Sequence, residues 1–459
     1  MNPKNLAAHF HNAMPLVWLL CLSCTAWGSL CWPVPAQAGL SYEQALARAV
    51  AQEARHKAEE QDAQASKAEG WRAIAGMGPT LTAYAQPSLN EDRLKRDPIL
   101  AQEYAGEDRK VSYHDTEVGL TLRQPLLDVE RINTARQGKQ RIGLADFMHI
   151  KAREDLSIRI AEQYYAVLAA EESYVIRQAE EETLQQQVAA AKERKELGYG
   201  TIIDVYDAEA RLELARAAAI AGEDEVDNAR LALMESLHQG SLEPVEQSPA
   251  LHMLPRRDKN LDFWQQQAQH SNTELHIRLL QAEMARLEHL ALLGRFAPRL
   301  GAVASYSYNN PSKSLYYASE EQESEAYIGL RLEMDLLAGG ADTAGAVAAS
   351  KRVQAARLRV EESRRAITRS VQSLWNSLGS TYALAEAYEQ SVQANRQALD
   401  ATREGYREGV KVLVDVLDAQ QKYYNALNQS QAVRNNYMVL YRKFLVMTGQ
   451  RILEDKVTP

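Results

Sequence analysis

The stretch GTIIDVYDAEARLELA (residues 200–215) has a second version later in the chain, VKVLVDVLDAQQKYYNAL (residues 410–427). Both contain the pattern Asp-Val-x-Asp-Ala a few residues after a glycine. The same offset of 211 residues separates three pairs: Gly198 and Gly409, Asp204 and Asp415, and Asp207 and Asp418. One offset shared by three pairs indicates an internal duplication. We therefore expect two copies of one structural unit that together build one body.

The composition is typical of long helices. Of the 459 residues, 46% are hydrophobic and 25% charged, whereas 7% are aromatic and only 14 are proline. Charged, proline-poor chains of this kind form coiled coils. The formal net charge is −9, and no stretch is dense in lysine and arginine. A nucleic-acid partner is therefore not expected.

The N-terminus has the features of an export signal. Lys4 precedes an apolar run at 15–32, and the small residues Ala36 and Ala38 fit a signal-peptidase cleavage site. This pattern predicts that residues 1–38 are a signal peptide. Two alternatives stay open, a retained membrane anchor and a lipoprotein, because the apolar run is 18 residues long and contains cysteines.

Cysteine usage limits the chemistry of the exported part. The three cysteines of the chain, Cys21, Cys24 and Cys31, all lie within the predicted signal peptide. After cleavage the protein would have neither a disulfide nor a thiolate metal site. No later stretch has 18 consecutive apolar residues, so a membrane crossing would have to use strands.

Each half of the chain follows one order of elements: a helix, a β-hairpin, a long helix and a return helix. The predicted boundaries are a first structural repeat at 39–239, an inter-repeat linker at 240–260, a second structural repeat at 261–450 and a C-terminal tail at 451–459. The two β-hairpins are expected at 79–125 and 298–335. Three prolines in the linker rule out a continuous helix between the repeats.

The expected hairpin strands alternate between apolar and polar residues. TLTAYAQPSLN (80–90) and EVGLTLRQ (117–124) belong to the first repeat, and RLGAVASYSYNN (299–310) and YIGLRLEM (327–334) to the second. Period-two alternation places unlike side chains on the two faces of a sheet, as in a membrane strand between lipid and water. A soluble hairpin with one face on a core gives the same pattern, so this alternative stays open.

Two regions predict very long helices. Neither 128–197 nor 344–408 contains a proline. At 1.5 Å per residue, a helix of 70 residues is roughly 105 Å long. The second region also has apolar residues at alternating steps of four and three, from Ile367 to Leu399, which is typical of a coiled-coil seam.

Four strands are too few to close a membrane barrel. An open sheet edge in lipid would leave backbone groups without hydrogen bonds, at several kcal/mol each. The chain is therefore expected to oligomerise. A dimer would supply eight strands, whose interior side chains fill, whereas a trimer would supply twelve and keep an open lumen.

The order of elements, the duplication and the paired tip motifs resemble the TolC-type outer-membrane efflux proteins (the outer membrane factor family). The motifs are GYGTIIDVYDA (198–208) and GVKVLVDVLDA (409–419), the latter overlapping YREG (406–409). The resemblance covers essentially residues 39–450. It implies a mainly α fold with membrane β-structure. Four strands per chain would complete a 12-stranded trimeric barrel, continued by a long antiparallel coiled-coil periplasmic tunnel.

The resemblance also implies a function. The expected protein is an outer-membrane channel-tunnel that exports small molecules, polypeptides or both in a tripartite efflux or type I secretion system. Its expected location is the outer membrane of a Gram-negative bacterium, extending into the periplasm. Its expected partners are two further copies of itself, outer-membrane lipid, a periplasmic adaptor (membrane fusion) protein and an inner-membrane transporter.

The repeated motif has two interpretations. Gly198 and Gly409 suit the C-terminal caps of helices, and aspartates favour the first turn of the following helix. Alternatively, these carboxylates form rings at a narrow periplasmic aperture. The i, i+3 spacing places Asp207 on the same helix face as Asp204. The resemblance aligns Tyr406, Lys411, Asp415 and Asp418 with residues that close this entrance, with Asp204 as a partner on the neighbouring hairpin. Lys411 stands where an arginine is expected, so it keeps the charge but loses the bidentate geometry.

Two further classes of function compete with the channel. EARH (53–56) and ESLH (235–238) match the Glu-x-x-His pattern of di-iron helical bundles, although two more inward glutamates would be needed. A non-conducting coiled-coil scaffold would leave the alternating hairpins unexplained. We therefore predict no catalytic residue, no metal ligand and no cofactor, and we do not expect an enzyme.

Overall fold

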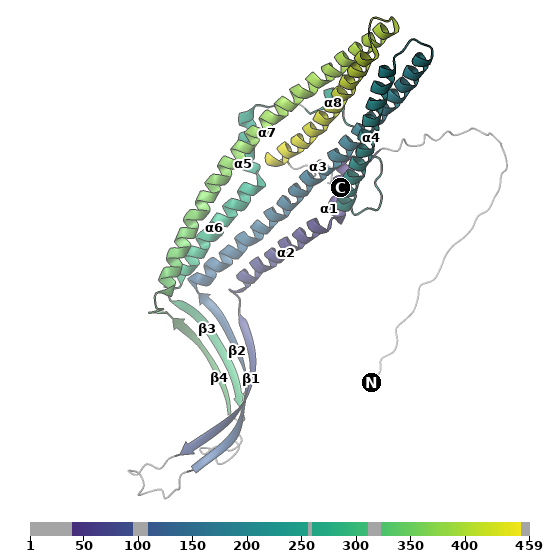
Figure 1. The fold of residues 1–459 in the computed structure, drawn as a ribbon. Coiled ribbons are helices and arrows are strands. Elements are labelled where there is room, and N and C mark those ends of the chain that lie inside the picture. Colours follow the sequence, from purple (N-terminus) through teal and green to yellow (C-terminus); the bar gives the residue numbers. More distant parts are fainter. Residues whose placement is uncertain (1–38, 95–108, 256–258, 311–322, 451–459) are drawn as a thin grey trace, which may run out of the picture. The chain divides into compact units, whose positions relative to one another are not determined.

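The computed structural model describes residues 39–94, 109–255, 259–310 and 323–450 (Figure 1). The predicted signal peptide (1–38) and C-terminal tail (451–459) lie outside the described residues, as do parts of both hairpin loops. Residues 256–258 of the predicted linker also lie outside them.

The two repeats place their elements in the same order (Figure 1). The first contains α1 (Tyr42–Gln52), α2 (Ala54–Ala75), β1 (Thr80–Leu94), β2 (Arg109–Leu127), α3 (Val129–Glu196) and α4 (Ile202–Leu237). The linker contains the short 3-10 helix η1 (Leu251–Met253). The second repeat contains α5 (Leu261–Ser271), α6 (Thr273–Gly294), β3 (Arg299–Asn309), β4 (Glu323–Glu333), α7 (Ala341–Arg407) and α8 (Leu413–Met447). The predicted fold class, mainly helical with a four-stranded sheet, is confirmed.

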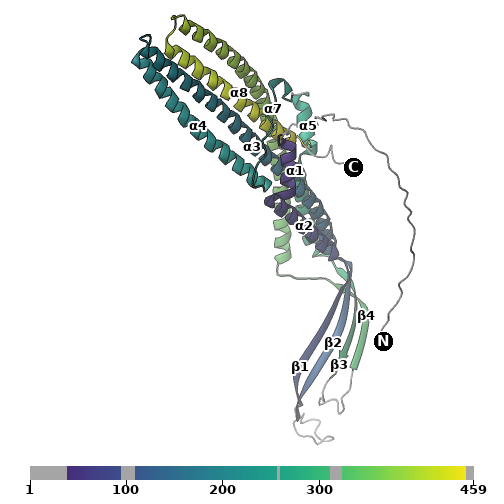
Figure 2. The same cartoon turned by 90° about the vertical axis from the view of Figure 1, so that its right-hand side faces the viewer.

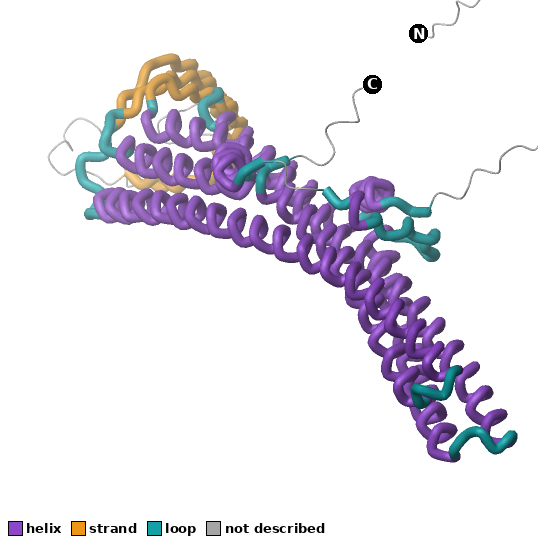
Figure 3. The backbone as a smooth tube through the Cα atoms, turned by 90° about the horizontal axis from the view of Figure 1, so that it is seen from above, coloured by secondary structure: helices purple, strands orange, loops and turns teal. Residues whose placement is uncertain are grey.

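The long helices form because nothing in their sequences interrupts the backbone ladder. α3 has 68 residues and α7 has 67, and both are free of proline. Each is followed by an antiparallel return helix, so α3 packs along α4 and α7 along α8, and α3 also packs against α8 (Figure 2). Figure 3 shows the strands at one end of the long helices and the two turns between helices at the other.

Among the helices of the described ranges, none is both long and apolar enough to cross a membrane.

The largest core cluster lies where α1 packs against α3, with contributions from the other helices. Its residues include Tyr42, Tyr164 and Tyr165, whose rings contact one another. The guanidinium of Arg442 lies 4.1 Å from the centroid of the Tyr42 ring. Burial raises the pKa of Tyr42 to about 12, so this phenol stays neutral beside the cation.

One expectation about the first helix of each repeat was wrong. Each was expected to be continuous, but each is broken at one residue, Glu53 in the first repeat and Asn272 in the second. Glu53 is extended, and Arg159 of α3 donates to both of its carboxylate oxygens at 2.7 Å. The Asn272 side chain caps α6 by accepting from Leu275 and donates to the backbone oxygen of Met447 at 3.0 Å. Both breaks are held by partners distant in sequence, which a local pattern does not reveal.

The four strands form one antiparallel sheet in the order β1-β2-β3-β4, and the β2–β3 pairing joins the two repeats. Its register separates the two kinds of side chain. One face carries apolar residues: Leu81, Ala83, Ala85, Val118, Leu120, Leu122, Leu300, Ala302, Ala304, Ile328, Leu330 and Leu332. The other carries polar ones, among them Thr80, Thr82, Thr121, Arg123, Ser305, Ser307, Arg331 and Glu333.

The apolar face of the sheet is not covered by the helices. Leu330 is 68% exposed and Ile328 is 85% exposed. A contiguous apolar surface on a sheet is unfavourable in water and indicates contact with lipid or protein.

Candidate functional site at the tips of the helical hairpins

The α3–α4 and α7–α8 turns have the same backbone structure. Gly198 (φ 81°) and Gly409 (φ 76°) both take the left-handed conformation, which glycine adopts without steric cost. After α3, the Tyr199 N–H donates to the Arg194 carbonyl oxygen at 2.8 Å. After α7, the Val410 N–H donates to the Gly405 carbonyl oxygen at 2.8 Å. These bonds are those of a Schellman C-cap, so both glycines fit the capping interpretation.

The first aspartate of each motif lies in the first turn of its return helix. The Asp204 carboxylate accepts from the Thr201 backbone N–H at 3.0 Å, while the Thr201 hydroxyl accepts from the Asp204 N–H at 3.1 Å. This pair is a complete capping box. In the second copy only one half is possible, because Val412 has no hydroxyl; Asp415 accepts from the Val412 N–H at 3.4 Å.

A small apolar cluster packs the two tips together. Leu184 and Val188 of α3 and Leu212 of α4 are buried against Leu413 and Leu417 of α8. The second hairpin therefore rests on the first through side chains near its own turn, and its position at the tip depends on these contacts.

Two arginines of the first hairpin bind residues of the second that the sequence singled out. Arg211 of α4 donates to the Asp418 carboxylate at 2.5 Å and to the Gln421 side-chain oxygen at 3.2 Å. The guanidinium of Arg194 lies 4.4 Å from the centroid of the Tyr406 ring, a cation–π contact between α3 and α7. The sequence analysis did not identify either arginine. One feature of the sequence pointed weakly to Arg211. It directly precedes Leu212, an apolar position between the paired helices, and long charged side chains beside such positions bridge paired helices.

The other predicted aperture residues have different surroundings. The Lys411 ammonium is 3.6 Å from the Asp415 carboxylate on the same hairpin, and the two side chains are 51% and 38% exposed. An exposed pair of this length contributes little stability. Asp207 is half-buried on α4 and makes no ion pair with another described residue. Within one chain the structure thus brings Tyr406, Asp415 and Asp418 to one tip, and places Asp204 and Asp207 on the adjacent hairpin.

The turns themselves expose apolar side chains. Tyr199 is 84% exposed and Val410 is 80% exposed, and Leu197, Ile203 and Val412 are also exposed. Apolar residues gathered on two adjacent turns are a feature of protein-binding surfaces.

The Glu-x-x-His patterns do not assemble into a metal site. Glu53 is bound by Arg159, and His238 forms the left-handed end of α4. In the described part of the chain, no three or more His, Cys, Asp or Glu side chains group in a way that could hold a metal ion.

The fold agrees with the comparisons to known proteins. The model of the outer membrane efflux protein family matches residues 42–238 and 264–442. The alkaline protease secretion protein AprF of Pseudomonas aeruginosa is 28% identical over 334 residues, which cover 72% of this chain and 69% of AprF. The outer membrane protein TolC of Vibrio cholerae is 27% identical over 296 residues, covering 64% of this chain and 68% of TolC.

Solved structures share the fold at low sequence identity. The structure of CusC superposes with a TM-score of 0.77 at 15% identity, covering 89% of this chain and 92% of CusC. The Campylobacter jejuni CmeC outer membrane channel gives a TM-score of 0.74 at 14% identity and covers 94% of both chains.

Because the family model matches most of the chain, this protein belongs to the outer membrane efflux protein family. It is an outer-membrane channel-tunnel of the kind used in efflux or type I secretion, and the predictions of family, function and location are confirmed. Members of this family are channels and not enzymes.

Proposed function

We propose that three copies of this chain assemble into the export duct of a tripartite system and that the tips described above form its periplasmic gate. The observation that carries the proposal is the pairing of an amphipathic four-stranded sheet at one end of the long helices with two interlocked tips at the other. A sheet of this kind suits a boundary between lipid and water, and the tips suit a closable entrance.

The trimer follows from the sheet edges. Within the described residues, β1 and β4 each pair on one side only. In lipid the outer edges need hydrogen-bonding partners, which β4 of one copy and β1 of the next can supply. Three copies give twelve strands, the smallest multiple that leaves an open lumen.

The gate is built from the second hairpin of each copy. Tyr406, Lys411, Asp415 and Asp418 are its charged and polar residues, and Asp204 and Asp207 belong to the neighbouring hairpin. We add Arg211 and Arg194 to this set, because they hold Asp418 and Tyr406 against the first hairpin. Opening requires the second hairpin to leave these arginines, so both contacts favour the closed state.

The position of the tip turns and their exposed side chains indicate the kind of partner that binds there. The tip turns lie at the end of the helices farthest from the strands, and they expose apolar side chains such as Tyr199 and Val410. A periplasmic adaptor protein or an inner-membrane transporter is the partner expected there. AprF of Pseudomonas aeruginosa and the similar protein PrtF of Dickeya chrysanthemi are both named for protease secretion, which favours a polypeptide as the exported cargo.

Native mass measurement and planar-bilayer recording test the assembly and the duct. The detergent-extracted protein should have the mass of three chains and should form a narrow channel. A soluble monomer would contradict the trimer, and a trimer that never conducts would favour the scaffold alternative.

Cysteine crosslinking tests the partner surface. Residues 39–459 contain no cysteine, so Tyr199→Cys and Val410→Cys are clean probes. We expect crosslinks from both to a protein of the inner membrane or periplasm. Asn309→Cys, at the far end of β3, is the matched control. Crosslinks from Asn309→Cys alone would show that the orientation is reversed.

A further inference from the structure

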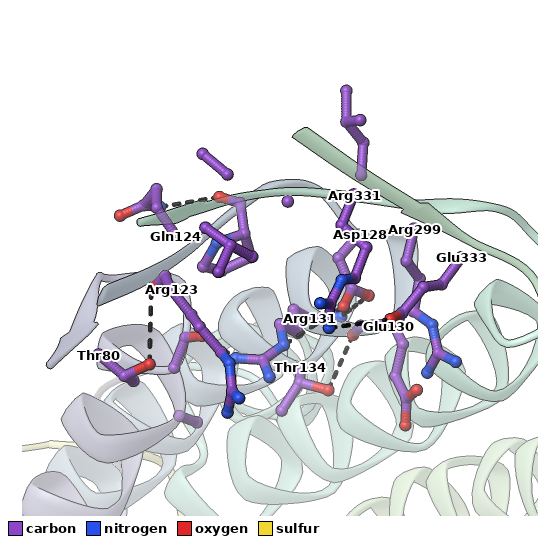
Figure 4. Close-up of a pocket in the computed structure, with 17 residues that line it drawn as sticks. Thr80, Arg123, Gln124, Asp128, Glu130, Arg131, Thr134, Arg299, Arg331 and Glu333 are labelled. Carbon is purple, nitrogen blue, oxygen red and sulfur yellow. Dashed lines mark hydrogen bonds and ion pairs between the residues drawn. The ribbon is translucent and has the colours of Figure 1, made fainter. Parts of the chain in front are cut away.

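A cavity of about 690 Å³ lies where the strands meet the helices (Figure 4). Its walls come from the helix-proximal ends of all four strands, the end of α2 and the first turns of α3. The charged side chains that line it are Arg123, Arg131, Arg299, Arg331, Asp128, Glu130 and Glu333. The site lies far along the chain from the tip motifs and has no part in the proposed gate.

The arginines of the sheet whose side chains the structure describes all lie at this end. Three strand arginines, Arg123, Arg299 and Arg331, line the cavity, and the register places them on the polar face. The acidic residues of that face lie mostly nearer the loops: Asp115, Glu117, Glu323 and Glu325. Over the residues with described side chains, the polar face thus changes from acidic near the loops to more basic at the junction with the helices, although the whole chain carries a net charge of −9.

Two of the three acids of the cavity are bound by arginines other than the strand arginines. Asp128 caps α3 and lies 3.3 Å from the Arg131 guanidinium. Glu130 is bound at 2.9 Å by Arg295, which does not line the cavity.

The strand arginines differ in how they are paired. Arg299 is paired with Asp335 at 2.7 Å. Arg331 is 3.7 Å from Glu333, and both side chains are more than half exposed, so this contact is weak. The Arg123 guanidinium has no hydrogen bond or ion pair with any described residue.

The cavity wall beside these arginines includes a position without a side chain. Gly301 lies opposite Arg331 in the sheet, and a Cβ atom built there would have only the Gln124 carbonyl oxygen, at 3.4 Å, within van der Waals distance. Arg123 and Arg331 therefore both border a cavity whose wall has no side chain at Gly301. Guanidinium groups bind carboxylates through two parallel hydrogen bonds.

We propose that this cavity is a binding site for carboxylate groups, with Arg123 as its principal residue and Arg331 as its second. The role of this site rests on the proposed function. In the proposed trimer the polar face of the sheet lines the passage, so the three cavities form a basic belt at the end of the helices opposite the acidic tips. Carboxylate side chains of a passing polypeptide are the natural ligand, and a free polycarboxylate shares their chemistry.

Titration calorimetry on the detergent-solubilised full-length protein tests the site. The probes are citrate, a free tricarboxylate, and a hexa-aspartate peptide, which presents carboxylates as a polypeptide does. Arg123→Gln should weaken binding about tenfold, because one charge-assisted hydrogen-bonding partner is lost. Arg123→Lys should retain part of the affinity, and binding should weaken as salt is raised.

The controls separate the site from general charge effects. Arg357→Gln removes an exposed arginine of α7 outside the cavity and should leave binding unchanged. The Arg123 side chain has no hydrogen bond or ion pair with a described residue to lose, so Arg123→Gln should keep the wild-type thermal midpoint. Absence of binding to the wild-type protein, or equal affinity in Arg123→Gln and Arg357→Gln, would overturn the proposal. Binding of citrate alone would restrict the site to free anions and exclude the role in polypeptide passage.

Bilayer recording tests the role of the belt. In the Asp415→Ala, Asp418→Ala background the acidic tip no longer dominates, so the channel should be anion-selective, and adding Arg123→Gln with Arg331→Gln should reduce that selectivity. Unchanged selectivity would overturn the belt. A protein that binds the peptide but never conducts would contradict the proposed duct and leave the site intact.

Discussion

The two aspartates of each repeated motif have different surroundings. Asp204 and Asp415, in the first turn of the return helix, accept from the backbone N–H three residues earlier. Asp207 and Asp418 lie one turn further along. Asp418 binds Arg211 of the other hairpin, whereas Asp207 has no such partner among the described residues. The motif therefore combines a capping position with a position free for tertiary contacts, so the two interpretations of the sequence are compatible.

The contact between Arg211 and Asp418 leads to the first prediction. Arg211→Ala should raise single-channel conductance severalfold, because the second hairpin loses a charged contact that holds it closed. Arg216→Ala is the control, since Arg216 pairs with Glu181 and Glu213 inside the first hairpin. Combining Arg211→Ala with Asp418→Asn should add little to either single change. Equal conductance in the Arg211 and Arg216 variants would remove Arg211 from the gate.

The carboxylates of the tip lead to the second prediction. Asp415→Ala with Asp418→Ala should abolish cation selectivity and the block by millimolar divalent cations, because clustered carboxylates attract cations and exclude anions. Thr201→Ala is a control that removes a helix cap and should cost about 1 kcal/mol of stability without changing selectivity. If the double variant only lowers the thermal midpoint, the aspartates are caps and not a filter.

The sequence revealed part of the tip. The shared offset located Gly198 and Gly409, because a left-handed C-cap requires a residue type that a sequence displays directly. Arg194 and Arg211 were missed because their partners depend on how two helix pairs are rotated against each other. That rotation is determined by packing of residues such as Leu212 and Leu417, which no short motif encodes.

At the scale of elements, the lengths of the long helices could be predicted from the sequence, whereas the breaks in the first helix of each repeat could not. α4 (Ile202–Leu237) is the return helix that the order of elements predicted, and the absence of proline correctly indicated the extent of α3 and α7. The breaks at Glu53 and Asn272 depend on Arg159 and on the Met447 carbonyl, which are distant in sequence. The alternation of apolar and polar residues restricted the strand register, since a one-residue slip between two strands would bring apolar and polar side chains onto the same face of the sheet.

The sheet faces lead to the third prediction. Leu120→Arg and Leu330→Arg should impair membrane insertion, at a cost of roughly 2–4 kcal/mol near the bilayer midplane. Thr121→Arg, next to Leu120 but on the polar face, should have a small effect. The yield of detergent-extractable protein in outer membranes measures the difference. Equal losses for Leu120→Arg and Thr121→Arg would show that the lipid-facing side is assigned incorrectly.

The packing of α2 on α3 leads to a fourth prediction, which concerns pH. The His56 side chain is buried, its ring centroid lies 6.0 Å from that of His149, and the Nδ1 atoms of both have no hydrogen bond among the described residues. Burial, followed by the nearby His149, lowers the pKa of His56, while Glu53, Glu59 and Glu60 oppose this shift. The folded state therefore favours neutral His56. Stability should be fully present above pH 6.5 and fall as the pH drops below it.

Thermal unfolding between pH 7.5 and pH 5 measures this effect. His56→Phe removes the titrating group and should flatten the fall in the midpoint on the acid side. His252→Gln, at an exposed position, should leave the wild-type pH dependence unchanged. If His56→Phe keeps the full acid loss, protonation of other groups destabilises the fold.

At the scale of the whole molecule, the chain is incomplete as a membrane protein. Its sheet has two free outer edges and one uncovered apolar face within the described residues, and its second hairpin needs the first to hold its tip. The same duplication that builds one chain from two repeats provides the pattern for joining chains, because β2 of one repeat already pairs with β3 of the next. We expect the junction between β4 of one copy and β1 of the next to repeat that pairing.

Disulfide mapping tests this closure directly, because residues 39–459 contain no native cysteine. Cysteines at Ala326 or Ile328 of β4, each combined with Ala83→Cys of β1, should join copies and give dimer and trimer bands on a non-reducing gel. Which β4 position crosslinks fixes the register at the junction. Ala83→Cys with Leu120→Cys is the control, since these residues are direct partners within one chain and should give only a monomer band. If β1–β4 pairs crosslink within a single chain, each copy closes its own sheet. The proposed trimer, the shared lumen and the basic belt would then all have to be abandoned.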